Sequence, residues 1–286
     1  MRLIDETIDG IDGTVARFRG YLIDNSSQMD PDRVRPAVLI LPGGAYAHTS
    51  PREAEPIALK MIGYGYQAFI LDYSCAPSVY PVALLETAEA MKRIREHAAQ
   101  WHIDPGAIVI AGFSAGGHAA ALFSEQWDNE AVIEHEYTPE RIRPNGLMLG
   151  YPVISAGPYA HRDSIDNLLG RGRRRDPEWL DQVSLELHAD AGHVPQTFLW
   201  TTVTDQAVDV RNSMLFANAL IEAGVNVELH VFPTGGHGSS LGTPETDNGS
   251  HSIGDLPCVS VWPSLFDRWV QDKFPAATSW KSGNRG

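Results

Sequence analysis

Ser114 lies in the sequence Gly112-Phe113-Ser114-Ala115-Gly116, where the residue types could make its hydroxyl a nucleophile. An apolar run over residues 107–111 precedes this motif, and an alanine-rich stretch over residues 117–122 follows it. A serine on a tight turn between a strand and a helix projects its hydroxyl above the sheet, and the flanking glycines let the two backbones approach. The pattern predicts such a strand, turn and helix. The alternative interpretation is an ordinary glycine-rich turn in another α/β protein.

A serine hydroxyl is a weak nucleophile and needs a histidine base within hydrogen-bond reach. The chain has 11 histidines, and His237 is favoured because it lies in a glycine-rich loop that could bring it to Ser114. His230 falls within an expected strand, and His118 lies in the helix after the serine, where we expect it to pack internally. His48 follows another glycine-rich loop and is a candidate substrate contact.

The base in turn needs a carboxylate that fixes its orientation and stabilises its charged form. Asp205 and Asp209 both lie in the loop between an expected strand and the next helix. Asp205 is favoured because it follows the strand directly, whereas Asp209 is close enough to the helix start to interact with the helix dipole. Asp72 also follows an expected strand, but it precedes the nucleophile and breaks the order serine, aspartate, histidine.

The elements that must position these residues alternate between strand and helix. The sequence predicts an α/β fold with a mostly parallel sheet and helices on both faces, in which residues 15–23 form an antiparallel edge strand. Residues that follow parallel strands meet at one edge of the sheet, so the three side chains are expected to converge there. Further strands are expected over residues 37–41, 67–73, 107–111, 146–153, 197–203 and 226–232, and helices over 54–63, 83–97, 212–224 and 261–274.

Periodicity weakens between residues 154 and 194, which are expected to form a small cap over the carboxyl ends of the strands. A length of 286 residues allows one large or two small domains, and the need for candidate catalytic residues from both ends of the chain favours one domain over residues 1–286. The arginine-rich segment 171–175 is interpreted as a solvated surface, with a role in holding a carboxylate substrate as the alternative.

A formal net charge of −14 argues against nucleic acid or an anionic membrane surface as a partner. No apolar run reaches the roughly 18 residues of a membrane span, and the stretch that begins at Met1 lacks the apolar region of a signal peptide, so a cytoplasmic location is expected. Cys75 and Cys258 match neither a disulfide framework nor a compact metal motif. Neither a metal nor an organic cofactor is expected, and no pattern in the sequence defines an oligomeric state.

From Pro36 to about Leu241 the sequence resembles α/β-hydrolase esterases of the hormone-sensitive-lipase and carbohydrate-esterase type, a group that includes acetyl-xylan-esterase-like and feruloyl-esterase/dienelactone-hydrolase-like proteins. Its relatives commonly carry a proline where this chain has Asp209, which keeps the choice of acid open, and a histidine and a glycine where this chain has Pro42 and Ala45. The resemblance rests on six segments: Leu41–Tyr46, Asp104-Pro105, Ala111–His118, Tyr151–Ser155, Thr204–Ser213 and His230–Gly238.

The resemblance implies a nucleophile, an acid and a base for acyl transfer, and backbone donors for an oxyanion. The expected substrate is a small-molecule ester, with short acyl groups and acetylated sugars favoured. A prolyl-oligopeptidase-like peptidase is an alternative, for which Glu53 and Glu55 would be candidate anchors of a peptide amine, and a non-catalytic α/β-hydrolase binding protein is another. The implied residues are Ser114, Asp205 and His237 for catalysis and Gly44, Ala45 and Ala115 for the oxyanion hole.

Overall fold

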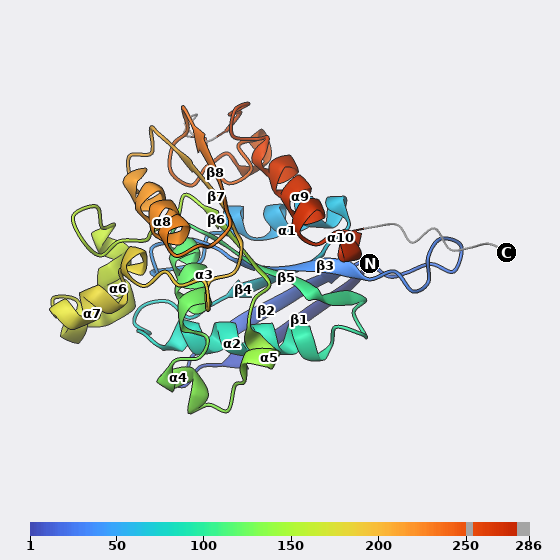
Figure 1. The fold of residues 1–286 in the computed structure, drawn as a ribbon, viewed down its shortest axis with the longest axis horizontal. Helices are drawn as coiled ribbons and strands as arrows, with labels where there is room; N and C mark the ends of the chain where they lie inside the picture. Colours follow the sequence, from blue (N-terminus) through green and yellow to red (C-terminus); the bar gives the residue numbers. More distant parts are fainter. Residues whose placement is uncertain (250–253, 279–286) are drawn as a thin grey trace.

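The computed structural model describes residues 1–249 and 254–278, which fold around an eight-stranded sheet (Figure 1). The strand order is β1-β2-β4-β3-β5-β6-β7-β8. Strands β3 to β8 pair in parallel, and β1 and β2 pair antiparallel to their neighbours, so the predicted mostly parallel α/β sheet is confirmed. The strands are β1 (Arg2–Asp9), β2 (Val15–Leu22), β3 (Arg35–Leu41), β4 (Gln67–Asp72), β5 (Ile103–Phe113), β6 (Gly146–Gly150), β7 (Thr197–Thr202) and β8 (Val227–Phe232).

The prediction that residues 15–23 form an edge strand is wrong, although their antiparallel pairing is confirmed. Strand β2 has β1 on one side and β4 on the other, so β1 is the edge. The sequence of β1 mixes charged and apolar residues without regular alternation, and only Ile8 of this strand is buried. An edge strand that covers little core needs few apolar residues, and for this reason its sequence shows only a weak strand pattern.

Apolar side chains of the central strands alternate between two cores, one on each face of the sheet. Along β3, Leu39 and Leu41 belong to one core, whereas Val38 and Ile40 belong to the other. Helices α2, α3 and α8 cover the first face, and α1, α9 and α10 cover the second (Figure 1). These helices are α1 (Glu55–Tyr64), α2 (Val82–Glu96), α3 (Ala115–Gln126), α8 (Arg211–Glu222), α9 (Trp262–Lys273) and α10 (Pro275–Thr278).

Short elements fill the connections. The segment over residues 154–194 packs against the first core through buried Ile165 and Leu168 of its longest helix. It contains α6 (Arg162–Arg173), α7 (Pro177–Gln182) and the 3-10 turn η2 (Leu185–Leu187), while α4 (Glu130–Ile133), α5 (Pro139–Ile142), η1 (Pro51–Glu53) and η3 (Pro244–Thr246) lie in other loops.

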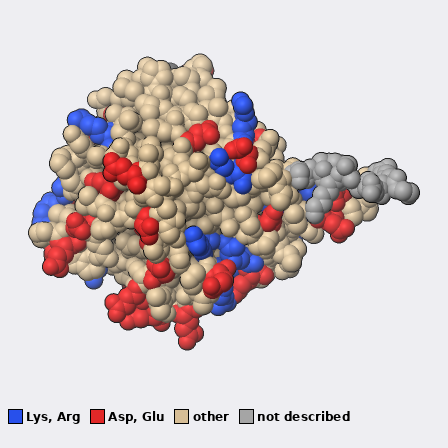
Figure 2. Space-filling model, in the orientation of Figure 1, with Lys and Arg blue, Asp and Glu red and all other residues tan. Residues whose placement is uncertain are grey.

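Charged side chains are spread over the surface. On the face drawn in Figure 2, acidic groups lie in several places among fewer basic ones, with no continuous basic area. Within the part of the chain that the structure describes, no helix combines the length and apolarity needed to cross a membrane. Cys75 and Cys258 are both free thiols.

Candidate active site

Ser114 occupies the turn between β5 and α3 with φ 54° and ψ −122°, a conformation that costs energy for a residue with a side chain. The glycines around it permit close backbone contacts. A Cβ at Gly112 would meet the carbonyl oxygen of Gly116 at 2.1 Å, and one at Gly116 would meet that of Leu41 at 2.1 Å. The strand, turn and helix expected from the sequence are therefore present, and any larger residue at either glycine would force this turn open.

Three side chains form a continuous hydrogen-bonded chain at the carboxyl edge of the sheet. The hydroxyl of Ser114 lies 2.7 Å from Nε2 of His237, and Nδ1 of His237 lies 2.7 Å from Oδ2 of Asp205. The side chain of Asp205 is fully buried, and its Oδ1 accepts hydrogen bonds from the backbone N–H groups of Ala207 and Val208 at 2.9 and 3.0 Å. With a proton on Nδ1 facing the carboxylate, Nε2 is left to accept the serine proton.

Asp209 and Asp72 lie away from this chain. Asp209 forms an ion pair with Arg211 at 2.5 Å, and the hydrogen bond from this guanidinium lowers the pKa of the carboxyl. Asp72, at the end of β4, forms an ion pair with Arg19 of β2 at 2.8 Å. In the strand order, β3, β5 and β6 separate β4 from β7 and β8, the strands that precede Asp205 and His237. Of the acids weighed from the sequence, the structure brings Asp205 beside His237.

The other histidines have separate environments. His118 is buried, with Nδ1 2.9 Å from the Tyr46 hydroxyl and Nε2 2.9 Å from the Val183 carbonyl, and burial lowers its pKa to about 4. His230 lies in β8 and contacts Glu228. His118 therefore packs internally as expected, and His230 lies in a strand as expected but is only partly buried.

The loop after β3 carries backbone N–H groups that have no partner. Gly44 has φ 128° and Ala45 has φ 57°, so the chain turns sharply here. Among the described residues, none accepts a hydrogen bond from the N–H of Gly44, Ala45 or Ala115, the last being the first residue of α3. Free donors in a loop and at the start of a helix are suited to a developing negative charge.

Glu53 and Tyr151 connect the glycine-rich loop to the histidine loop. The Glu53 carboxylate is buried and accepts hydrogen bonds from the Gly43 N–H at 2.8 Å and from the Tyr151 hydroxyl at 2.6 Å. The same hydroxyl accepts a hydrogen bond from the Ser240 N–H at 3.0 Å, and the Tyr151 ring meets the His237 ring edge-on at 5.2 Å. The two loops are therefore held in register by one buried carboxylate and one buried hydroxyl.

A cavity of about 260 Å³ opens over Ser114. Most of its described lining residues have polar or charged side chains and none has a large aliphatic side chain, although the atoms that face the cavity are more apolar than polar. His161 enters it from the 154–194 segment, with its ring parallel to that of His237 at 6.5 Å between centroids; burial, and to a lesser degree His237, lower its pKa. The lining residues are Gly44, Ala45, His48, Ser50, Arg52, Glu53, Ser114, His161, His237 and Gly238.

Reasoning from the sequence missed several of these residues. Glu53 was considered only as an amine anchor, yet both of its oxygens are occupied, and Glu55 accepts a hydrogen bond from the Tyr21 hydroxyl. Arg52 and His161 lie in irregular segments where periodicity carries no information. The only available signal was their proximity in sequence to the glycine-rich loop and to the expected cap.

This fold is shared with known proteins. The sequence profile of the family described as "alpha/beta hydrolase fold" matches residues 38–241. That is more than half of the chain, and the chain therefore belongs to the alpha/beta hydrolase fold family. The predicted family resemblance and fold class are confirmed.

Particular relatives carry esterase and xylan-related names. Endo-1,4-beta-xylanase B of Butyrivibrio fibrisolvens is 35% identical over 76% of this chain and 34% of its own length. Acetylxylan esterase of Xylanibacter ruminicola is 28% identical over 72% of this chain and 42% of its own length. The chain thus spans between a third and a half of the length of these two relatives.

Solved structures match almost the whole chain. An acetyl ester-xyloside bifunctional hydrolase from Caldicellulosiruptor lactoaceticus has a TM-score of 0.76 and 33% identity, over 93% of this chain and 90% of that one. A carboxylesterase from Lactobacillus plantarum has a TM-score of 0.83 and 25% identity, over 96% and 98% of the two chains.

Proposed function

We propose that the protein is a serine carboxylic ester hydrolase that removes short acyl groups, acetyl in particular, from polar alcohols such as sugars. The observation that carries this proposal is the unbroken series of hydrogen bonds from Ser114 through His237 to Asp205 beneath a small cavity lined mostly by residues of polar type. The printed names of relatives, which include an acetylxylan esterase and an acetyl ester-xyloside hydrolase, support the same substrate class.

The first step is attack on the ester carbonyl. His237 takes the proton from the Ser114 hydroxyl through Nε2 as the oxygen bonds to the carbonyl carbon. Asp205 stabilises the resulting imidazolium through the hydrogen bond to Nδ1. The unpartnered N–H groups of Gly44, Ala45 and Ala115 supply the donors for the oxyanion, and their fixed orientation favours the charge of the tetrahedral intermediate over the neutral ester.

Collapse of the intermediate breaks the bond to the alcohol, which takes the proton from His237 and leaves. Water then enters, gives a proton to His237 and attacks the acyl group on Ser114. The second collapse releases the acid and restores the serine hydroxyl. All proton transfers therefore use the imidazole of His237, and water is the second reactant.

The size and polarity of the cavity favour short acyl groups and polar alcohols. Its volume of about 260 Å³ lies below the usual range for sites of drug-sized ligands. A long acyl chain gains affinity mainly from apolar surface buried on binding, and a cavity of this volume, without large aliphatic side chains among its described lining residues, has little room to bury it. The affinity of an acetyl ester of a hydroxyl-rich alcohol depends less on buried apolar surface, so this cavity favours such an ester.

We further propose that residues 154–194 act as a small cap within a single domain. The segment contributes His161 to the cavity, and the Asn167 side-chain amide donates to the Ala45 carbonyl at 2.9 Å. Its Val183 carbonyl binds His118. A segment with these contacts would restrict the bulk of the alcohol that reaches Ser114.

The test combines covalent labelling with ester turnover. A fluorophosphonate probe should label Ser114, and 4-nitrophenyl acetate should be hydrolysed faster than the butyrate and octanoate esters. Asp209→Asn serves as the matched control for Asp205→Asn, because both are aspartates in one loop. Labelling of Ser114 together with amide hydrolysis but no ester hydrolysis would favour a peptidase. The absence of both labelling and ester hydrolysis would favour a non-catalytic binding protein. Either outcome contradicts the proposal.

A further inference from the structure

Arg52 carries a permanent positive charge beside the nucleophile. It lines the cavity with Ser114 and His237, and its Nη1 donates to the Gly238 carbonyl at 2.7 Å. Within residues 1–249 and 254–278, neither Nε nor Nη2 of Arg52 has a hydrogen-bond partner, and no carboxylate forms an ion pair with it. Neither atom is fully buried, since neither is among the buried atoms that lack a partner.

The two open donors have a specific geometry. Nε–H and Nη2–H lie on one edge of a planar guanidinium and point the same way, which matches the two oxygens of a carboxylate. A neutral hydroxyl or ester oxygen would use only one of these donors. The chain as a whole has a net charge of −14, so an anionic ligand would bind this surface only where a local cation offsets the repulsion.

The neighbouring charged groups leave Arg52 available. The Glu53 carboxylate is occupied by the Gly43 N–H and the Tyr151 hydroxyl, and that of Asp205 is occupied by His237 and two backbone N–H groups. The arginine-rich segment 171–175, considered earlier for a carboxylate, lies elsewhere. Arg174 and Arg175 pair with Asp166, and no residue of the segment lines the cavity.

The position of Arg52 selects one part of the substrate. In the proposed reaction the leaving alcohol takes its proton from His237 and therefore lies on the His237 side of the ester. Arg52 binds the carbonyl of Gly238, the next residue along the chain, and a Cβ at Gly238 would lie 3.0 Å from Nη2. The guanidinium is thus adjacent to the alcohol part.

We propose that Arg52 binds a carboxylate on the alcohol part of the substrate, so that the enzyme prefers acyl esters of acidic alcohols, an acetylated hexuronic acid being the sugar example. This inference rests on the proposed esterase function and specifies its substrate class.

Two chromogenic acetates test the inference. 4-Acetoxy-3-nitrobenzoate carries the carboxylate on its alcohol part, and 4-acetoxy-3-nitrobenzamide is its neutral counterpart. The ratio of their kcat/KM values is compared in wild type, Arg52→Gln, Arg52→Lys and the control Arg268→Gln, whose arginine is exposed on α9. The ratio is decisive because loss of the bond to Gly238 would affect both substrates equally.

We expect the ratio to fall about tenfold in Arg52→Gln, because a charge-assisted hydrogen bond is lost for only one substrate. Arg52→Lys should give an intermediate ratio, since it keeps the charge without the paired donors. Arg268→Gln should match wild type. In wild type alone, added salt should lower the ratio, which keeps the test valid even where Arg52→Gln fails to fold.

An equal fall for both substrates would overturn the inference and would restrict Arg52 to holding the His237 loop. A ratio in wild type that does not respond to salt would overturn it as well. Mono(4-nitrophenyl) succinate places the carboxylate on the acyl part, and a larger loss with this ester would contradict the assignment to the alcohol. Turnover of both acetates without a charge preference leaves the proposed esterase intact, whereas turnover of neither refutes the esterase and this inference together.

Discussion

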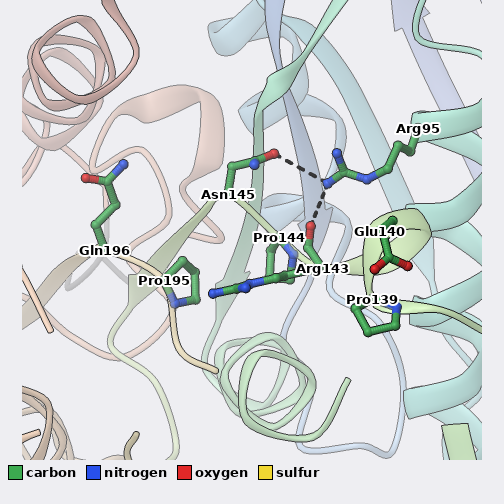
Figure 3. A pocket seen from close by; sticks show the side chains of 8 residues that line it. All are labelled: Arg95, Pro139, Glu140, Arg143, Pro144, Asn145, Pro195 and Gln196. Carbon is green, nitrogen blue, oxygen red and sulfur yellow. Dashed lines mark hydrogen bonds between the residues drawn. The ribbon is translucent and has the colours of Figure 1, made fainter. Parts of the chain in front are cut away.

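Two cavities, one at the amino edge of the sheet and one over Ser114 at the carboxyl edge, differ in size and in chemistry. At the amino ends of β6 and β7, a cavity of about 570 Å³ is lined by Arg95, Arg143, Asn145 and their neighbours (Figure 3). Arg95 there donates to the carbonyls of Pro105 and Arg143 and to the Asn145 side chain, while its Nε has no partner among the described residues. The cavity over Ser114 has less than half that volume.

The smaller cavity nevertheless holds the reactive groups. Ser114 and His237 both line it and share a hydrogen bond. The backbone donors of Gly44 and Ala45 have no partner among the described residues. None of the eight residues around the larger cavity is a serine, cysteine or histidine. The comparison teaches that reactive side chains converging on one point distinguish a site better than volume does. The following predictions contrast the two edges, beginning with the largest effect.

Removing the nucleophile should abolish activity, whereas a change at the amino edge should not. Ser114→Ala is expected to lower kcat about 10⁴- to 10⁶-fold, because no other group can form the acyl-enzyme. Gln196→Ala, in the larger cavity, should leave kcat within about twofold, as expected for a residue that contacts no reacting atom. Initial rates with 4-nitrophenyl acetate measure both, and a large effect at Gln196 would contradict the comparison.

Changing the acid tests which aspartate orients the base. Asp205→Asn should lower kcat about 10⁴-fold, because an amide at this position favours the wrong imidazole tautomer. Asp209→Asn should have little effect, since Asp209 is paired with Arg211 at the surface. Steady-state kinetics of the two purified variants decide the matter. A mild Asp205 variant together with a severe Asp209 variant would show that the acid has been assigned wrongly.

Two buried tyrosines offer a matched test of positioning. Tyr151→Phe leaves the Glu53 carboxylate and the Ser240 N–H each without one partner, and should cost about 1–3 kcal/mol of unfolding free energy. It should also lower kcat about tenfold, because a small displacement of reacting groups is costly. Tyr66→Phe breaks a similar bond, 2.7 Å to Asp267, near the start of β4.

Tyr66→Phe should therefore destabilise the protein without lowering kcat. Urea unfolding and initial rates, measured on both variants, separate stability from positioning. Equal losses of kcat in the two would show that Tyr151 acts only through stability. A pH–rate profile of Tyr151→Phe that is displaced from that of wild type would support its contact with His237.

His118, on the catalytic side, should make the protein less stable in acid. Its pKa is lowered to about 4 by burial, so below pH 6.5 the unfolded chain binds a proton that the folded chain does not. The unfolding free energy should fall by up to about 3 kcal/mol as the pH drops from 6.5 towards 4. His118→Asn should flatten this part of the stability curve, and an unchanged slope would contradict the account.

His193, before β7 at the amino edge, should behave in the opposite way and more weakly. Partial burial would lower its pKa, but hydrogen bonds to Asp190 and Asp128 outweigh burial and raise it. Its stabilising effect is present below the unfolded pKa and is lost as the pH rises through the raised pKa. His193→Gln should cost about 0.5 kcal/mol at pH 5 and nothing at pH 9, measured by urea unfolding.

Sequence patterns predicted the parts of the site that depend on neighbours in the chain. Ser114 and His237 lie in glycine-rich loops that directly follow strands, and the buried strands are continuous apolar runs, so local sequence was sufficient. The pair of Glu53 and Tyr151 lies 98 residues apart in sequence and meets only in the folded protein, so no local pattern could identify it. Strand β1 was missed because its exposed edge needs few apolar residues.

The most direct test of the account is to identify the acyl-enzyme. Wild type mixed with excess 4-nitrophenyl acetate and quenched within the first turnover should release a burst of one nitrophenolate per chain wherever deacylation is the slower step. Peptide mass spectrometry should then find one acetyl group on Ser114, with none in Ser114→Ala. An acetyl group on another residue, or ester turnover that persists in Ser114→Ala, would contradict the central claim.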